Sequence, residues 1–233
     1  MTHRVHPYSF RLVQLRPWKS RWFNLKKMKD YLREDTLVRE WLAKKLKKMH
    51  VESIEIERSP NTMHVILRTS RPGLIIGRGG EGAEVLKKEI EKKLTTIWRA
   101  HTKLGKKQEK MNLKLSIQEV QVPDLSAAIN GELIAEELEK RLPFRRVLKQ
   151  SIERISTHKG VKGVKVALKG RLDGAEMARY EWLKSGRIPL QTIRADIDYA
   201  ETRALTAYGI IGIKVWIYKG DVFAERGTEE KKS

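Results

Sequence analysis

Cysteine is absent from this 233-residue chain, and so is any long apolar run. Without cysteine the protein has no disulfide, no thiolate nucleophile and no cysteine-ligated zinc, which suits a reducing compartment. No stretch approaches the roughly 18 uninterrupted apolar residues of a transmembrane helix. The opening MTHRVHPYSFRL also lacks the apolar core of a signal peptide. These absences predict a cytoplasmic protein with no membrane partner.

Acidic residues are scarce relative to basic ones. Aspartate and glutamate number 29 against 49 lysines and arginines, so the formal net charge is +20 and the pI about 10.1. A chain with this charge repels itself unless a polyanion neutralises it, and the obvious polyanions are nucleic acid and anionic membrane. The balance therefore predicts a large anionic partner and no small-molecule substrate.

The histidines form no pattern typical of catalysis or metal binding. His3 and His6 lie in a basic segment with no acidic third ligand nearby, so we expect them to be solvated or to contact phosphate. The others are scattered, with no nucleophile and orienting carboxylate to pair with; they are His50, His64, His101 and His158. We predict no enzymatic activity, no metal and no cofactor.

The length favours two small domains, and the hydrophobic periods predict the α+β class for both. Residues 1–25 mix basic and aromatic side chains without a helical or strand period, which indicates an arm lying on a partner. Packing on its own domain through Trp18, Trp22 and Phe23 is the alternative. The predicted divisions are an arm at 1–25, a domain at 26–125, a second domain at 126–222 and a disordered polar tail at 223–233.

In the first domain the apolar spacing predicts helices and a three-stranded mixed sheet. Asp35 or Thr36 is suited to cap the first helix. The basic, aperiodic stretch at 98–110 is expected to be a surface loop. The expected elements are a helix over 36–49, strands around 54–56 and 65–67, a short apolar turn of helix, a helix over 83–97 and a strand over 113–117.

In the second domain two helical patterns precede four alternating runs, which predicts two helices and a four-stranded sheet. The expected helices cover 126–142 and 144–155, and the expected strands lie near 164–168, 176–183, 193–199 and 211–217.

The stretch LIIGRGGEG, residues 74–82, admits three interpretations. Gly77, Gly79 and Gly82 match the G-x-G-x-x-G spacing of a dinucleotide-binding turn, but Pro72-Gly73 leaves no room for the strand required before it, and the ribose-binding acid is missing downstream. A flexible helix–helix turn is the second. The third, a G-x-x-G clamp for RNA phosphates, is favoured because apolar residues precede it and a helix follows it. The clamp residues are Gly77, Arg78, Gly79 and Gly80.

The longest informative segment is GRLDGAEMARYEWLKSGRIPLQTIRADIDYAETRALTAYGIIGIKVWIYKG, residues 170–220. It resembles the C-terminal domain of small ribosomal subunit protein three of bacterial type nearly throughout, and the first half is similar to a type II KH domain. The segments VHP, PGLIIGRGG and FRR also fall at the family's corresponding places.

The resemblance implies a structural, rRNA-binding component of the small-subunit head, beside the channel through which mRNA enters. Small-subunit proteins ten and fourteen are the implied neighbours. In that family, basic residues on the helix after FRR face incoming mRNA and assist its unwinding; here these are Arg145, Arg146 and Lys149, whereas Gln150 stands where a further basic residue is common.

Within residues 170–187, Arg171, Arg179, Lys184 and Arg187 are predicted to contact rRNA phosphates. Tyr180 and Trp182 offer stacking surfaces, although core packing is the expected role of Trp182. The chain departs from the family pattern in its N-terminal start and in the longer basic stretch around 98–110, for which an extra RNA or neighbour contact is the hypothesis.

Two rival functions belong to other classes. A free KH-type regulator of mRNA explains residues 1–125 but leaves 170–220 unexplained. A nuclease or lyase needs paired carboxylates for a metal; Asp196 and Asp198 are the best candidates, but their alternation with Ile197 and Tyr199 is what a solvated strand edge shows.

Overall fold

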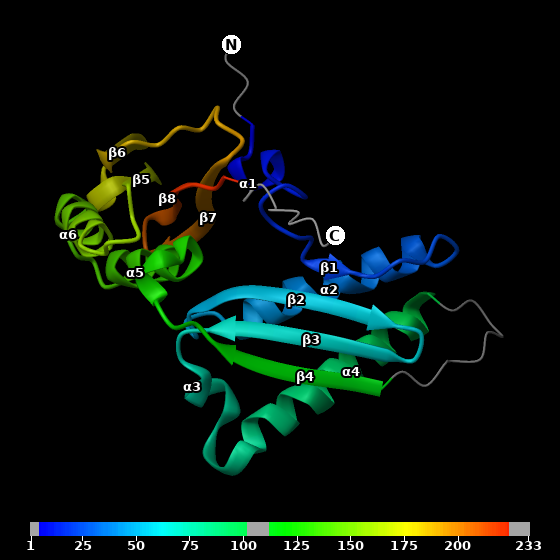
Figure 1. The fold of residues 1–233 in the computed structure, drawn as a ribbon. Coiled ribbons are helices and arrows are strands. Elements are labelled where there is room, and N and C mark those ends of the chain that lie inside the picture. Colours follow the sequence, from blue (N-terminus) through cyan, green and yellow to red (C-terminus); the bar gives the residue numbers. More distant parts are fainter. Residues whose placement is uncertain (1–4, 102–111, 224–233) are drawn as a thin grey trace, which may run out of the picture.

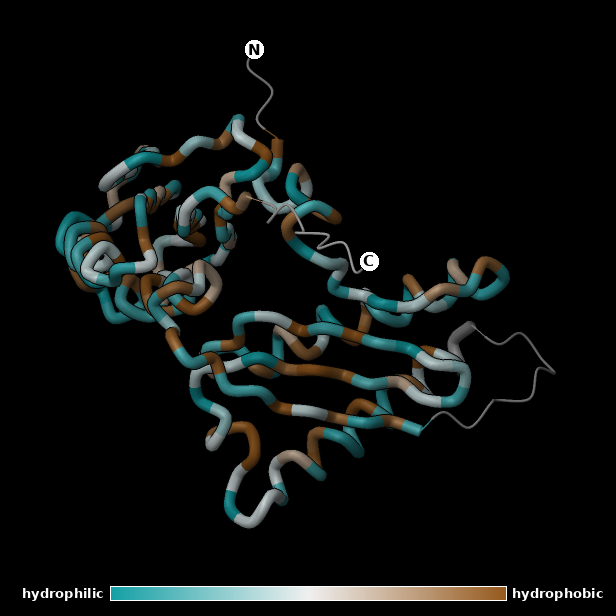
Figure 2. Tube along the Cα trace, viewed as in Figure 1, coloured by the Kyte–Doolittle hydropathy of each residue, from teal (hydrophilic) through white to brown (hydrophobic). Residues whose placement is uncertain are grey.

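The computed structural model describes residues 5–101 and 112–223, and it contains two four-stranded sheets, each with its own helices (Figure 1). The hydropathy colouring of Figure 2 shows apolar residues interleaved with polar ones along the outer strands of the N-terminal sheet and a continuous apolar stretch in the strand Thr62–Thr69. The predicted class, α+β in two domains, is confirmed. Residues 98–101 of the predicted basic loop are helical instead, whereas its residues 102–110 and residues 224–233 of the tail lie outside the described part of the chain.

The N-terminal sheet has the order β1-β2-β3-β4, with β2 and β3 antiparallel and β3 and β4 parallel. Two long helices cover one face of it, and Ile56, Val65, Leu42 and Ile90 are fully buried between the layers. The elements are α2 (Met28–Lys45), β2 (Val51–Ser59), β3 (Thr62–Thr69), α3 (Pro72–Ile76), α4 (Glu81–His101) and β4 (Asn112–Glu119).

The arm departs from the prediction because it contains regular structure. The helical turn α1 (Pro7–Phe10) is capped by His6, whose Nδ1 accepts hydrogen bonds from two backbone N–H groups. Strand β1 (Ser20–Arg21) pairs in parallel with β2, so the predicted three-stranded sheet gains a fourth strand. A two-residue strand is too short to show alternation in a sequence.

Helix α2 begins at Met28, eight residues before the predicted start, and the predicted cap at Asp35 or Thr36 is wrong. Asp35 lies inside the helix and is fully buried. It accepts hydrogen bonds from the Arg58 guanidinium, with Nε to Oδ1 at 2.8 Å, and from the indole of Trp22 at 2.8 Å. An internal ion pair, and not a cap, therefore explains an acid at this position.

The C-terminal sheet has the order β6-β5-β8-β7 and is antiparallel throughout. Helices α5 and α6 pack on one face, burying Val166, Ile213 and Ile155 among others. The elements are α5 (Ala127–Glu139), α6 (Phe144–Ser156), β5 (Gly163–Gly170), β6 (Arg179–Gly186), β7 (Ala195–Thr206) and β8 (Gly209–Asp221).

The predicted core role of Trp182 is wrong. Its side chain stands on the edge strand β6 and the residue is 45% exposed. Alternation along β6 places Leu183 beside Val166 on the helix-covered face, so Trp182 faces the opposite side.

The arm packs on the C-terminal domain through Arg11, which is 1% exposed. Its guanidinium donates to the carbonyl oxygens of Ala195 at 2.7 Å, Pro7 at 2.9 Å and Thr192 at 2.9 Å. Of the three aromatic residues named for the alternative, Trp18 and Phe23 are 59% and 88% exposed, whereas Trp22 packs on the N-terminal domain and donates to Asp35 at 2.8 Å. A buried cation thus holds the arm on the C-terminal domain, while Trp18 and Phe23 stay largely exposed.

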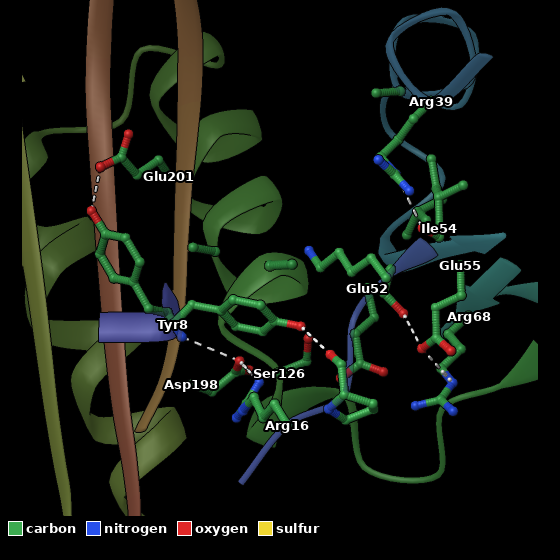
Figure 3. A pocket seen from close by; sticks show the side chains of 18 of the residues that line it. Tyr8, Arg16, Arg39, Glu52, Ile54, Glu55, Arg68, Ser126, Asp198 and Glu201 are labelled. Atoms are coloured by element: carbon green, nitrogen blue, oxygen red, sulfur yellow. Dashed lines mark hydrogen bonds and ion pairs between the residues drawn. The ribbon is translucent and has the colours of Figure 1, made fainter. Parts of the chain in front are cut away.

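Arg16 continues this attachment in the cleft between the arm and the two domains, which has a volume of about 820 Å³ (Figure 3). It pairs with Asp198 at 2.8 Å and with Asp196 at 3.1 Å. Asp198 also accepts the backbone N–H of Ala127 at 2.8 Å, at the start of α5. The interpretation of the two acids as a solvated strand edge is therefore wrong: they are an internal anchor.

Candidate nucleic-acid interface

The predicted clamp loop joins α3 to α4. Gly77 and Gly79 have φ of +71° and +64°, in the left-handed region that favours glycine. No atom lies within 4 Å of a Cβ built on Gly79 or Gly80, so a ligand can approach the backbone there. Arg78 is exposed at the tip. The structure therefore brings the four predicted clamp residues together in one open loop.

Gly82 serves a different purpose from the clamp glycines. A Cβ on it would lie 2.7 Å from the carbonyl oxygen of Ile75 and 2.9 Å from that of Ile76. Only glycine lets α4 begin this close to α3. The third glycine of the dinucleotide spacing is therefore a packing requirement, and α3 occupies the place where that motif needs a strand.

Apolar side chains flank the loop. Leu74, Ile76 and Val85 are 59%, 37% and 52% exposed. Glu81 and Glu84 stand in the first turn of α4, where they complement the positive end of the helix dipole but repel phosphate. Arg78 is then the cation of the loop, beside an apolar surface suited to unpaired bases.

The clamp can be tested by replacing Arg78 and Gly79 with Asp. We expect about tenfold or greater weakening of single-stranded RNA binding by the full chain, because the loop loses a cation and gains two anions where phosphate approaches. The fold should persist at a modest cost in backbone strain at position 79, since aspartate is among the few residues besides glycine that adopt the left-handed region and the site is open. The measurement is fluorescence anisotropy with an unstructured oligonucleotide.

The matched control changes charge in the same direction on the exposed start of α2, by Lys29→Glu and Arg33→Glu. It should shift the affinity much less than the loop variant. Equal losses for both variants would assign the effect to overall charge and leave the loop a simple turn.

Helix α6 presents the second predicted site. Phe144, Val147 and Leu148 are buried against the sheet, while Arg145, Arg146, Lys149 and Gln150 are exposed on the other side. The first turn contains no acidic residue. Cations at the positive end of a helix dipole are unfavourable by a few tenths of a kcal/mol or more each. The arrangement thus reduces helix stability while it displays cations to solvent.

The predicted rRNA contacts are not gathered on one surface. Arg171 donates to the carbonyl oxygen of Ala175 at 2.9 Å and lies over the Tyr208 ring at 5.7 Å, so it also holds a loop against the β7–β8 turn. Arg179 and Lys184 lie on opposite faces of β6 by strand alternation. Arg187 is exposed in the segment that follows.

Sequence reasoning missed the basic residues beside Lys184 on the same face of the sheet. Lys165 and Lys169 of β5, Arg203 of β7 and Lys214 of β8 share that face. The signal was available, because each occupies a polar position in an alternating run. The sequence pattern does not give the order of strands in the sheet, and that order is what brings these basic residues next to β6.

A metal centre finds no support in the described ranges 5–101 and 112–223: no group of three or more His, Asp or Glu side chains there could hold a metal ion. Asp196 and Asp198 are occupied by Arg16. Within the same residues, no helix is both long and apolar enough to cross a membrane.

The fold and the exposed glycine loop define an RNA-binding protein with a KH domain. Residues 37–125 match the KH domain family, and residues 134–217 match the family of the ribosomal protein S3 C-terminal domain. The small ribosomal subunit protein uS3 of Caldicellulosiruptor saccharolyticus is 46% identical over 100% of this chain and 98% of its own length. That of Endomicrobium trichonymphae is 45% identical over 98% of this chain and 92% of its own length.

A third relative, small ribosomal subunit protein uS3c of Cyanophora paradoxa, is 40% identical over 98% of this chain and 99% of its own length. The chain belongs to the uS3 family of small-subunit ribosomal proteins. It is therefore a component of the ribosome, and the resemblance predicted from residues 170–220 is confirmed.

Proposed function

We propose that this protein binds rRNA in the head of the small subunit and lines the channel through which mRNA enters, without catalysing a reaction. The observation that carries the mRNA role is the outward display of Arg145, Arg146 and Lys149 at the start of α6. The arginine guanidinium groups can bind phosphates bidentately, and the lysine adds a further positive charge. The surface therefore attracts the mRNA backbone irrespective of its base sequence.

The clamp loop, Gly77 to Gly80, binds unpaired RNA through its backbone and Arg78 in the same proposal. Arg179, Lys184 and Arg187 contact rRNA phosphates, with Arg171 as a further contact. Small-subunit proteins ten and fourteen are the proposed neighbours. A free KH regulator is disfavoured because relatives share the whole chain, including residues 134–217.

The mRNA role is tested by reversing the charge of Arg145, Arg146 and Lys149 to Glu. Ribosomes carrying the variant should translate through a stable hairpin at least about threefold more slowly, because the strand loses three phosphate contacts and meets repulsion. Translation of an unstructured message should change much less. The measurement is the elongation rate on matched messages with and without the hairpin.

An assembly check and a control variant make this test specific to the mRNA role. Gradient sedimentation should show the variant in the small-subunit peak, since these side chains contribute nothing to the buried core. Changing Lys140 and Lys159, which are exposed elsewhere in the domain, to Glu is the control. Equal rates through the hairpin for the α6 variant and the unmodified protein would remove the mRNA role.

A further inference from the structure

In the described part of the chain, the long helices of the C-terminal domain cover one face of its sheet and leave the other face open. Helices α5 and α6 cover the face that carries Val164, Val166 and Leu168 (Figure 1). The opposite face, which we name the outer face, is formed by the alternate residues of all four strands. Strand pairing orders these residues in three rows.

The rows are read directly from the register across β6, β5, β8 and β7. They are Tyr180, Lys169, Gly212 and Arg203; then Trp182, Ala167, Lys214 and Glu201; then Lys184, Lys165, Trp216 and Tyr199. Each row therefore contains at least one aromatic ring and at least one lysine.

The aromatic residues on β6 are available to a ligand. Tyr180 and Trp182 are each 45% exposed. They are two residues apart on one strand, so their side chains project from points roughly 6.6 Å apart. The Lys165 ammonium lies 4.6 Å from the centroid of the Trp182 ring and 5.2 Å from that of Trp216, which helps to orient the exposed indole.

The charge of the outer face is strongly positive. Lys165, Lys169, Lys184, Arg203 and Lys214 are its cations, and Glu201 is the one carboxylate among the strand residues that form the three rows. Glu201 is already engaged, because Lys214 pairs with it at 2.8 Å and the Tyr199 hydroxyl donates to it. These hydrogen bonds lower the pKa of Glu201, so it stays ionised.

Among residues 5–101 and 112–223, the segments that cover this face lie over one end of it. The segment 187–194 and α1 lie over the end that contains Ile197 and Tyr218, and His6 contacts the Tyr199 ring edge-on at 4.7 Å. Tyr180, Trp182 and Lys169 lie beyond this cover and remain exposed. The open end thus combines stacking surfaces with cations.

We propose that the open end of the outer face binds an unpaired segment of rRNA, with consecutive bases stacked on Tyr180 and Trp182 and phosphates on the surrounding lysines and arginine. Base–aromatic stacking beside a positive surface is a common means of holding single strands. The proposal rests on rRNA binding by this family and is independent of the mRNA role assigned to α6.

A protein neighbour fits this surface less well. The centres of protein–protein interfaces are depleted of charged residues, lysine above all. Here every row contains at least one lysine beside its aromatic residues. Their charge complements a polyanion, and their spacing lets phosphates be neutralised while bases lie on the rings.

The first measurement places a photo-crosslinking amino acid at position 184, beside Trp182, in chains assembled into small subunits. Crosslinks to rRNA are the expected result. Crosslinks to a protein or to mRNA instead would overturn the proposal, while the α6 test of the mRNA role would be unaffected.

The second measurement is oligouridine binding by the full chain in which the clamp is disabled by Arg78→Asp and Gly79→Asp. In that background Trp182→Leu should weaken binding about tenfold, whereas Trp182→Phe, which keeps an aromatic plane, should change it by less than about threefold. Neither substitution alters charge. If Trp182→Leu binds as tightly as the parent, stacking at this face is excluded.

Discussion

Replacing Arg58 with Met is expected to lower the free energy of unfolding of the N-terminal domain by about 3–5 kcal/mol. The Arg58 side chain is 1% exposed and pairs with Glu34 at 2.7 Å and with Asp35. The same carboxylates accept hydrogen bonds from the indoles of Trp98 and Trp22, at 2.7 and 2.8 Å. Removal of the cation leaves two buried carboxylates without charge compensation, which is far more costly than removal of an exposed pair.

Hydrogen exchange at the amides of β2 and β3 measures this effect in the N-terminal domain alone. Arg68→Met is the matched control, because Arg68 is on the adjacent strand and its side chain is 45% exposed, with Glu55 at 3.5 Å. The control substitution should lower the free energy of unfolding by no more than about 1 kcal/mol. Similar losses for Arg58 and Arg68 would show that the buried network does not stabilise the domain.

Replacing Arg11 with Met should destabilise the attachment of the arm by about 2–4 kcal/mol. Arg11 also donates to Leu190 at 3.0 Å and Pro189 at 3.3 Å, so one buried side chain holds both α1 and the segment that leads into β7. Methionine fills part of the volume but leaves buried carbonyl groups without donors. Burial lowers the pKa of Arg11, yet arginine stays protonated at neutral pH.

Faster hydrogen exchange over residues 7–19 and 187–195 should report the release of the arm, with β2 and β3 unchanged. Arg194→Met is the control, because Arg194 is exposed within the same segment and lies over the Phe223 ring at 5.4 Å. It should shift stability by no more than about 0.5 kcal/mol. Unchanged exchange in the Arg11 variant would mean that other contacts hold the arm.

The order of elements was accessible from the sequence because amphipathic periods are local. The glycine loop between two helices, the helix after Pro143 and the strand near Val166 lie where the periods placed them. The apolar period of the same helix predicted that Phe144 and Leu148 would be buried. The basic residues on its opposite face were therefore expected to be exposed, and these are Arg145, Arg146 and Lys149.

The errors share a physical cause, which is dependence on distant residues. Asp35 looked like a cap because its partner, Arg58, is 23 positions away. Asp196 and Asp198 looked solvated because Arg16 reaches them from 180 and 182 positions away. Trp182 was predicted to be in the core because nothing in the sequence indicates that β6 lies at the edge of the sheet.

The sequence by itself determined the charge, the two α+β units, the glycine loop and the family, since each depends on composition, period or a contiguous motif. Only the tertiary structure decided that a buried arginine holds the arm and that cations from β5, β7 and β8 join Trp182 on one face. Strand order and burial arise from packing between segments far apart in the chain, and no local pattern contains that information.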